Sequence, residues 1–337
     1  MRVRNHAMRR SKTIILAIAI TVTLSGCAAK QPAQPISETR LLLDTVCTIT
    51  MYEPYDHELL SEALDLCQEY EILFSRTVEG SDVWRINNAG GVPVTVHPDT
   101  VELIGLGLEY CALSGGFFDI TIGRLSSLWD FGGNAEVVPP ISEIEKAIET
   151  IDFRKITITE NTVQLGDPEA MLDLGGVAKG YIAEKLAIFL KEKGVKGAII
   201  DLGGNIVAVG AKPDGSAWNI GVEKPFGKSG ETLGVISTGA ASIVTSGIYE
   251  RQFVKDGKLY HHILDPTTGM PAESDVISAT VITESSAVGD AFSTIPVLLG
   301  KEKTMTLIDR VPGLKGIILI LENGEIFQQG DIDFIPL

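Results

Sequence analysis

The chain has 337 residues, enough for one large domain or two of ordinary size, and its 45% hydrophobic content is sufficient for a buried core. It carries 28 Lys and Arg against 44 Asp and Glu, so its formal net charge is −16. A protein that binds nucleic acid is expected to present a basic face. This charge balance therefore argues against nucleic acid as a partner.

The N-terminus has the pattern of a secretory signal. A basic segment at 9–12 precedes an apolar run at 13–24, which is too short to span a membrane. The run ends in L-S-G-C at 24–27, which is similar to a bacterial lipoprotein box. The sequence therefore predicts a signal peptide at 1–26 that is absent from the mature protein. The alternative is an ordinary signal peptide followed by an incidental cysteine.

On the lipoprotein interpretation, Cys27 is the lipidated residue. Each buried CH₂ of an acyl chain contributes ~0.8 kcal/mol, so several chains on one residue hold a protein firmly at a membrane. We expect residues 27–40 to form the anchor and a tether, because Pro32 and Pro35 favour an extended chain. The predicted location is the extracytoplasmic face of the bacterial cell membrane.

Three further cysteines follow: Cys47, Cys67 and Cys111. An odd number cannot all pair within one chain. Each lies in an apolar strand or helix pattern, so we expect three buried free thiols. No C-x-x-C motif or His/Cys cluster points to zinc.

The first half of the body is expected to be mainly helical. A strand at 41–51 comes first, because this stretch is rich in Thr, Val and Ile. Apolar residues then recur with helical spacing at 57–74, 98–114 and 141–151. Alternating residues at 155–165 predict a hairpin.

The stretch L-D-L-G-G-V-A-K-G-Y at 172–181 predicts a strand end, a glycine corner and a helix that runs to about Lys193. Gly175 and Gly176 allow a tight turn and close approach of another group. The first N–H groups of a helix lack internal partners, so a phosphate is a suitable guest there. The alternative is a plain turn, and the spacing fits neither a Rossmann nor a Walker motif. The expected buried stripe of the helix is Leu186, Ile188, Phe189 and Leu190.

The second half is rich in short strand patterns. D-G at 256–257 and N-G at 323–324 predict hairpins, and 285–299 predicts a helix. Strands and helices do not alternate regularly, so the sequence predicts an α+β or mixed fold rather than a doubly wound parallel sheet. We expect 41–337 to form one compact domain.

Three oxygen-bearing side chains fall close together in the helix predicted at 285–299. Asp290 and Thr294 are four residues apart and therefore share a face, with Ser293 beside them. Carboxylate and hydroxyl oxygens suit Mg²⁺ and are poor ligands for zinc. The alternative is a solvent-facing Asp and a Thr that bonds to its own helix.

Five motifs in this order resemble the FAD:protein FMN transferase family of the ApbE type. They are F-D-I-T-I-G at 118–123, the corner at 172–181, D-L-G-G-N at 201–205, H-H-I-L-D-P-T-T-G at 261–269 and G-D-A-F-S-T at 289–294. The resemblance covers nearly all of the mature chain. It implies a compact, two-lobed α+β fold with mixed or antiparallel sheets flanked by helices, and a flavin nucleotide in the cleft between the lobes.

The resemblance also implies the site residues. The metal ligands are a main-chain oxygen of Gly176 with Asp290, Ser293 and Thr294. The residues around FAD are Leu43, Thr77, Phe117, Phe118, Asp119, Asp173, Lys179 and Ile263. This chain departs from the family at two of these: Leu43 stands where a methionine is frequent, and Thr77 where an aromatic residue is frequent. Those two contacts are therefore the least certain part of the set.

His262, one of five histidines, is a candidate general base. A histidine with a pKa near neutrality can take a proton from a hydroxyl nucleophile. Asp290 is the other candidate, and the sequence does not choose between them. The alternative for His262 is a cross-strand packing residue. His261 points to the other face of the strand, so the two histidines are not expected to serve one site.

The activity implied by the resemblance is Mg²⁺-dependent transfer of FMN from FAD to a threonine hydroxyl of an acceptor flavoprotein, with release of AMP. Two rival functions use the same features. One is an FAD pyrophosphatase that gives FMN and AMP, and the other is a non-enzymatic flavin-binding lipoprotein. A metal beside the pyrophosphate favours chemistry over plain binding, because a binder has no need of it.

Overall fold

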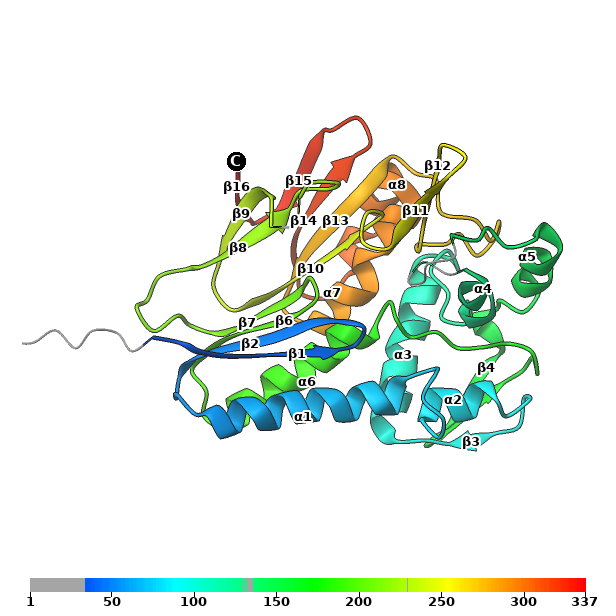
Figure 1. The fold of residues 1–337 in the computed structure, drawn as a ribbon, viewed down its shortest axis with the longest axis horizontal. Helices are drawn as coiled ribbons and strands as arrows, with labels where there is room; N and C mark the ends of the chain where they lie inside the picture. The colour runs from blue at the N-terminus through cyan, green and yellow to red at the C-terminus, as the bar shows by residue number, and fades with distance from the viewer. Residues whose placement is uncertain (1–33, 130, 132–135, 229) are drawn as a thin grey trace, which may run out of the picture. The chain divides into compact units, whose positions relative to one another are not determined.

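The core of the protein is an eight-stranded antiparallel sheet, seen in a computed structural model that describes residues 34–129, 131, 136–228 and 230–337 (Figure 1). Its strands lie in the order β1-β2-β6-β7-β10-β13-β14-β15. Their bounds are β1 Ile36–Leu42, β2 Thr45–Glu53, β6 Gly197–Leu202, β7 Asn205–Gly210, β10 Ala241–Gly247, β13 Val276–Thr283, β14 Leu314–Leu321 and β15 Ile326–Gly330.

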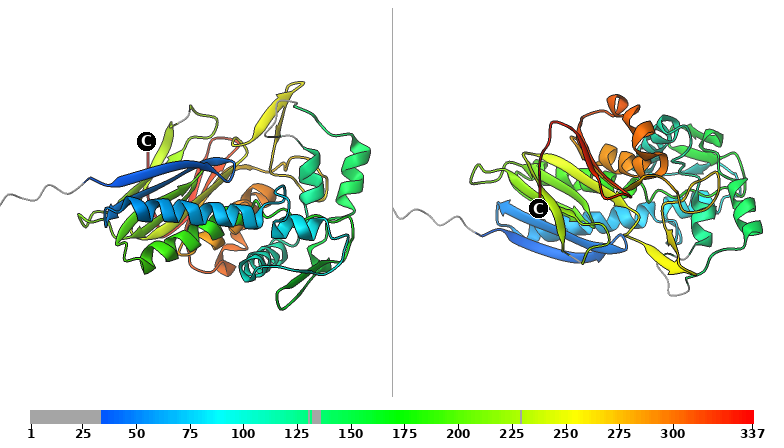
Figure 2. Two further views of the ribbon diagram at one scale, coloured as in Figure 1. Left: turned by 60° about the horizontal axis from the view of Figure 1, so that its bottom comes forward. Right: turned by 90° about the horizontal axis from the view of Figure 1, so that it is seen from above.

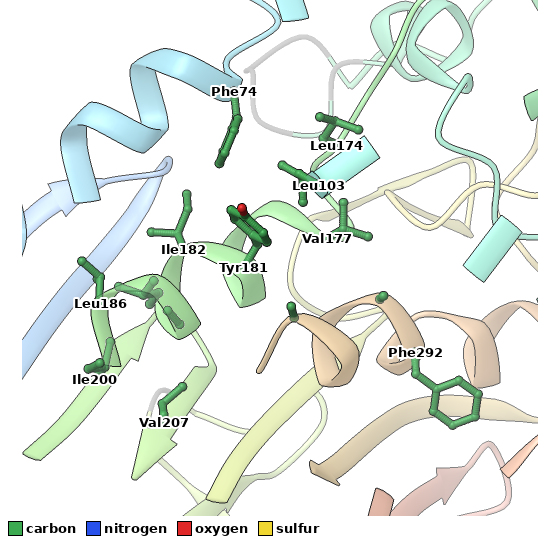
Figure 3. Packing of buried hydrophobic residues seen from close by; sticks show 14 of the residues in the cluster. Phe74, Leu103, Leu174, Val177, Tyr181, Ile182, Leu186, Ile200, Val207 and Phe292 are labelled. Atoms are coloured by element: carbon green, nitrogen blue, oxygen red, sulfur yellow. The ribbon is translucent and has the colours of Figure 1, made fainter. Parts of the chain in front are cut away.

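Three helices cover one face of this sheet: α1 (His57–Phe74), α6 (Ala178–Glu192) and α7 (Ser286–Ser293). Figures 1 and 2 show α1 and α6 side by side along that face. Apolar residues of the helices and the sheet meet in the main core, where Figure 3 shows Phe74, Leu103 and Ile182 around Tyr181. Burial of this apolar surface is the main force that holds helices and sheet together.

A three-stranded sheet covers the other face, in the order β16-β9-β8, with bounds Asp333–Pro336, Thr232–Thr238 and Trp218–Glu223. Alternate residues of β8 are buried and exposed, as expected for a strand with one face toward a core. Trp218, Ile220 and Val222 pack there against residues of the large sheet such as Ile243.

The remaining elements form the side of the molecule that carries the loops of the candidate site. The helices are α2 Asp82–Asn87, α3 Pro98–Leu113, α4 Gly123–Leu128, α5 Ile141–Ile148 and α8 Ile295–Met305. The strands are β3 Val94–Thr95, β4 Ile156–Thr159, β5 Thr162–Leu165, β11 Gln252–Lys255 and β12 Lys258–His261. Gln34–Leu337 forms one compact unit, and the predicted α+β class is confirmed.

Several local predictions were wrong in detail. The single strand expected at 41–51 is a hairpin, because Leu43 and Asp44 adopt φ values of 56° and 55° and turn the chain between β1 and β2. Strand β1 also takes in 36–40, the end of the expected tether. Ile188, expected in the core, is 45% exposed, whereas Leu186 and Leu190 are buried.

The helix expected at 285–299 is two helices, α7 and α8, that meet at Thr294, with a proline in the first turn of α8. Because a proline has no N–H, it is tolerated at a helix start but not in a helix interior. The segment between α1 and β3 contains the short helix α2, which the sequence analysis did not predict. Cys47, Cys67 and Cys111 are buried free thiols, as predicted.

Residues 1–33 lie outside the described part of the chain, so the signal peptide and the lipidation of Cys27 stay predictions. None of the helices in the described ranges is long and apolar enough to cross a membrane.

Candidate active site

The glycine corner brings Phe118 against the start of α6. Val177 and Ala178 donate backbone N–H groups to Leu174 and open the helix. A Cβ atom on Gly176 would lie 2.8 Å from the ring of Phe118, closer than real contacts allow. Only glycine therefore permits this approach, and two residues implied by the resemblance are brought together.

Asp290 on α7 is the most deeply buried carboxylate of the site. Its Oδ2 accepts a hydrogen bond from the backbone N–H of Gly180 on α6 at 2.7 Å. A Cβ on Gly180 would lie 2.3 Å from the carbonyl oxygen of Ser286 and 2.4 Å from the Cβ of Asp290. The two helices therefore touch through their backbones, and this contact positions the carboxylate.

Burial raises the pKa of Asp290. The positive charge of Lys179, the Gly180 N–H and the side-chain amide of Asn205 act in the opposite direction and favour the ionised form. Asn205 is itself buried, and its Oδ1 accepts a hydrogen bond from Ser286 Oγ at 2.8 Å. Its Nδ2 makes no hydrogen bond of ordinary geometry, so we assign it an electrostatic effect on Asp290 rather than a direct bond.

Three hydroxyl groups lie beside Asp290. Ser293 Oγ donates to the backbone carbonyl of Asp290 at 3.0 Å and lies 2.7 Å from Ser246 Oγ. Ser246 Oγ is in turn 3.3 Å from Thr294 Oγ1. The hydroxyls of Ser293 and Thr294 are therefore joined through Ser246 from β10, which the sequence analysis missed, and this group meets Asp290 at its backbone carbonyl. That the four oxygens form a metal site stays a prediction.

This donor set fits Mg²⁺ better than a transition metal. Within the described ranges, no group of three or more His, Cys, Asp or Glu residues is placed to hold a metal ion. Mg²⁺ typically takes one or two carboxylates and completes its shell with water and substrate phosphates. One buried carboxylate with neighbouring hydroxyls is such a site. Gly176 lies one turn before Gly180, at the same end of α6.

His262 follows β12 directly. Its backbone N–H donates to the carbonyl of Arg251 at 3.1 Å, and its buried Nδ1 has no hydrogen-bond partner among the described residues. Burial, together with the charges of Arg251, His261 and Lys179, lowers the pKa of His262 to about 4, below the near-neutral value expected from the sequence. The imidazole is therefore neutral at pH 7, with a nitrogen free to accept a proton.

His261 has a different environment. Its Nε2 lies 3.1 Å from the carbonyl oxygen of Ala272, and burial lowers its pKa to about 4 as well. That the two histidines have separate roles stays a prediction.

Lys179 is the cation of the site. Its charge acts on both Asp290 and His262, yet it makes no ion pair with any other described residue. An unpaired ammonium group at the start of a helix is placed to meet an anionic group such as a phosphate.

Asp173 has partners that the sequence did not reveal. Its Oδ2 accepts a hydrogen bond from Ser126 Oγ at 2.7 Å and lies 3.6 Å from Arg76 Nε. Its Oδ1 accepts from the N–H of Gly175 at 2.9 Å. Arg76 comes from the loop after α1, directly before Thr77, and the F-S-R-T stretch there was the only available signal.

The carboxylate of Asp119 is hydrogen-bonded to neighbouring groups of the protein. Its Oδ1 accepts from the backbone N–H and the hydroxyl of Thr121 at 2.8 and 2.7 Å, and its Oδ2 accepts from the Phe153 N–H at 3.1 Å. Burial raises its pKa, and these bonds oppose the rise. Its contact with FAD stays a prediction.

The other implied FAD residues are more scattered. Leu43 lies in the β1–β2 turn, where its N–H donates to Glu71 near the end of α1 at 2.7 Å. Thr77 is exposed just beyond that helix end, Ile263 is buried, and the ammonium of Lys303 lies 5.2 Å from the ring of Phe117. Within the described part of the chain, no hydrogen bond, ion pair or ring contact joins these four residues to one another, and their roles stay predictions.

Comparison with known proteins gives one consistent answer. Residues 43–318 match the model of the ApbE family. A FAD:protein FMN transferase of Treponema pallidum is 31% identical over 336 residues, which cover 94% of this chain and 93% of that protein. One from Klebsiella pneumoniae is 35% identical over 270 residues, covering 79% and 83%.

Solved structures agree. The ApbE protein of Thermotoga maritima superposes with a TM-score of 0.80 at 31% identity, covering 88% of this chain and 97% of that one. The flavin transferase ApbE of Vibrio cholerae gives a TM-score of 0.78 at 27% identity, with the same coverage. Because the family model matches most of the chain and the relatives and solved structures agree with it, the chain belongs to the ApbE family.

Proposed function

We propose that this protein transfers FMN from FAD to a hydroxyl group of an acceptor protein and releases AMP. The observation that carries the proposal is the buried Asp290, held by the Gly180 N–H near Lys179, which forms no ion pair with any residue that the structure describes. A cation-binding carboxylate next to a free ammonium suits a pyrophosphate. The names of the relatives support the same activity.

We further propose that Asp290, Ser293, Thr294 and the main-chain oxygen of Gly176 hold Mg²⁺. The ion supplies neutralisation of the charge that develops on the phosphoryl oxygens. Lys179 neutralises the phosphates from the helix end, and Phe118 at Gly176 provides an aromatic wall for the bound nucleotide. Phosphoryl transfer needs mainly this kind of positioning and charge compensation.

The acceptor group in our proposal is a threonine hydroxyl. Its oxygen forms a bond to the phosphorus on the FMN side of the pyrophosphate, and the bond from that phosphorus to the bridging oxygen breaks. The bridging oxygen leaves with AMP. The hydroxyl proton passes to the imidazole of His262, which is neutral at pH 7.

We also propose that the protein is held at the extracytoplasmic face of the membrane through lipidated Cys27. The support is the L-S-G-C sequence after a short apolar run. Cys27→Ala should release the body into a soluble fraction or block processing. Unchanged membrane retention after complete signal removal would contradict the anchor.

The metal assignment is tested with Asp290→Asn, which keeps the size of the side chain but removes a charge. We expect this variant to release AMP from FAD about two orders of magnitude more slowly than wild type. Treatment of the wild type with EDTA should slow AMP release to a similar extent. Added Mg²⁺ should restore the EDTA-treated wild type but not the variant. If the variant cleaves FAD at the wild-type rate and EDTA has no effect, the metal assignment is wrong.

A further inference from the structure

Asn205 begins strand β7 next to α6 and α7, and only 1% of it is exposed. It closes the D-L-G-G-N motif at 201–205, but it is not among the metal ligands or FAD contacts that the resemblance implies. A side-chain amide has an acceptor oxygen and a nitrogen with two N–H donors. Because burial removes these groups from water, each is costly unless the protein compensates for it. The surroundings of both ends of this amide therefore matter.

One end of the amide is fixed to α7. Its Oδ1 accepts a hydrogen bond from Ser286 Oγ at 2.8 Å. Ser286 is the first residue of α7 and Asp290 lies four residues later, so both are on the same face of the helix. The other end, Nδ2, is buried and makes no hydrogen bond of ordinary geometry with any residue that the structure describes. Because Oδ1 is held at Ser286, Nδ2 lies at the helix face that carries Asp290.

The charge of Asp290 decides which way the amide is turned. Oδ2 of Asp290 already accepts the Gly180 N–H at 2.7 Å. The side chain of Asn205 lowers the pKa of Asp290, against the larger effect of burial, and so favours the carboxylate. A donor has this effect and an acceptor does not. The reverse orientation would set the amide oxygen against the carboxylate, and two acceptors repel each other. The amide therefore presents its N–H groups to Asp290.

The elements around Asn205 leave it little freedom to move. Its partner across the β10–β7 ladder, Val244, packs against α7, since a Cβ on Gly289 would lie 3.0 Å from Val244 Cγ2. From α6, the carboxylate of Glu184 accepts the backbone N–H of Ala287 at 3.2 Å and so holds the first turn of α7. A polar side chain on such rigid elements can fix the orientation of a neighbouring group.

We propose that Asn205 is a positioning residue, whose amide holds the Asp290 carboxylate in the orientation in which it binds the divalent cation. Groups that orient a metal ligand from behind typically contribute about 10–100-fold to metal affinity or activity. The inference rests on the metal site of the proposed function. It adds to that site a residue that does not itself contact the cation.

The test compares Asn205→Ala with wild type by two measurements on the full chain. The first is binding of Mn²⁺, which prefers the same oxygen ligands as Mg²⁺, followed by electron paramagnetic resonance without FAD. The second is the Mg²⁺ concentration that gives half-maximal release of AMP from FAD. We expect Asn205→Ala to weaken Mn²⁺ binding and to raise this Mg²⁺ concentration, each about tenfold. Saturating Mg²⁺ should restore most of the rate, because the reacting groups are unchanged.

Val244→Ala is the matched control. It removes buried methyl groups beside Asn205 and should lower the urea midpoint of unfolding, yet it leaves the amide in place. Its Mn²⁺ affinity should equal that of wild type. Ser286→Ala serves as the second variant if Asn205→Ala does not fold. It keeps the amide but frees Oδ1, so it should weaken Mn²⁺ binding to a smaller extent.

Three results would overturn the positioning role and leave the transferase and its metal site intact. They are wild-type Mn²⁺ affinity in Asn205→Ala, an equal loss of affinity in Val244→Ala, and, if Asn205→Ala does not fold, wild-type affinity in Ser286→Ala. A wild-type protein that binds no Mn²⁺ and releases AMP without Mg²⁺ would instead overturn the proposed metal site, and this inference with it.

Discussion

At the residue scale, Asp290 is a buried carboxylate whose burial is only partly compensated. A buried carboxylate is costly unless hydrogen bonds or a cation compensate for its lost hydration. The Gly180 N–H compensates in part, and Lys179 and Asn205 add favourable electrostatics, yet burial remains the largest influence on its pKa. A divalent cation between this carboxylate and the neighbouring hydroxyls would complete the compensation. This balance is the physical argument for a functional rather than a structural Asp290.

His262 gives a prediction at the same scale. His262→Ala should lower the rate of FMN transfer by ~10²–10⁴-fold and change FAD affinity little, because a base acts on the attacking hydroxyl and not on the bound nucleotide. Stopped-flow rates and fluorescence titration with FAD separate the two quantities. His261→Gln is the neighbouring control and should retain transfer. Loss of FAD binding with retained turnover would instead make His262 a wall of the pocket.

The sequence predicted which site residues lie close together only where those residues belong to one short segment of the chain. Asp290, Ser293 and Thr294 come together because they lie within one helical turn. Arg76, Asn205 and Ser246 come from three distant segments, and only the folded chain brings them to Asp173 and Asp290. Ser246 carried no local signal, whereas Asn205 lies in the D-L-G-G-N motif and Arg76 in the F-S-R-T stretch.

At the scale of elements, the contact between α6 and α7 depends on Gly180. Gly180→Ala should lower the free energy of unfolding by about 1–3 kcal/mol, because the added methyl group meets the backbone of Ser286 at 2.3 Å. Urea unfolding with an unchanged slope measures this loss. The Mg²⁺ concentration needed for FAD cleavage should rise, since Asp290 must move.

Gly105 offers a matched control on α3, because a Cβ there would meet no atom within 4 Å. Gly105→Ala should leave stability unchanged or raise it by up to about 1 kcal/mol, as expected for a helix interior. If Gly180→Ala and Gly105→Ala unfold at the same urea concentration, the close helix contact is not as described.

His261, at the end of β12, should make the free energy of unfolding depend on pH. The pKa of His261 falls from 6.5 in the unfolded chain to about 4 in the folded protein, chiefly through burial. As the pH falls, His261 is therefore protonated in the unfolded chain before it is protonated in the folded protein. The free energy of unfolding should fall by about 3 kcal/mol as the pH drops from above 6.5 to about 4. His262 acts in the same direction.

Buried carboxyl groups oppose this trend, because the pKa values of Asp119, Asp201 and Asp290 are raised in the folded state. The useful quantity is therefore the difference between wild type and His261→Gln in thermal unfolding across this pH range. The wild type should lose more stability than the variant as the solution is acidified. Parallel curves would show that His261 does not titrate as described.

The helices could be predicted better than the sheet. The long apolar periodicity of α1, α3 and α6 marks them in the sequence, because helical contacts are local. The strand order, in which β2 lies next to β6 and β10 between β7 and β13, depends on non-local pairing. The β1–β2 hairpin escaped notice because its turn uses Leu43 and Asp44 in place of the usual Asn-Gly or Asp-Gly.

At the scale of the whole molecule, the charge limits the kind of partner. The formal net charge of the chain is −16. Such a protein repels anionic polymers, with a strength that falls as salt is added. FAD is also an anion, so in the proposed function Lys179 and a bound cation would offset this repulsion at the site.

The most direct measurement incubates the full chain with FAD, Mg²⁺ and a purified acceptor flavoprotein, and follows the acceptor by mass spectrometry. A transferase adds the mass of FMN less water to the acceptor, releases AMP in equal amount, and gives a fluorescent band in a denaturing gel. Replacement of the acceptor threonine by valine should abolish all three signals. Free FMN that accumulates at the same rate with and without acceptor would contradict the account and identify a pyrophosphatase instead.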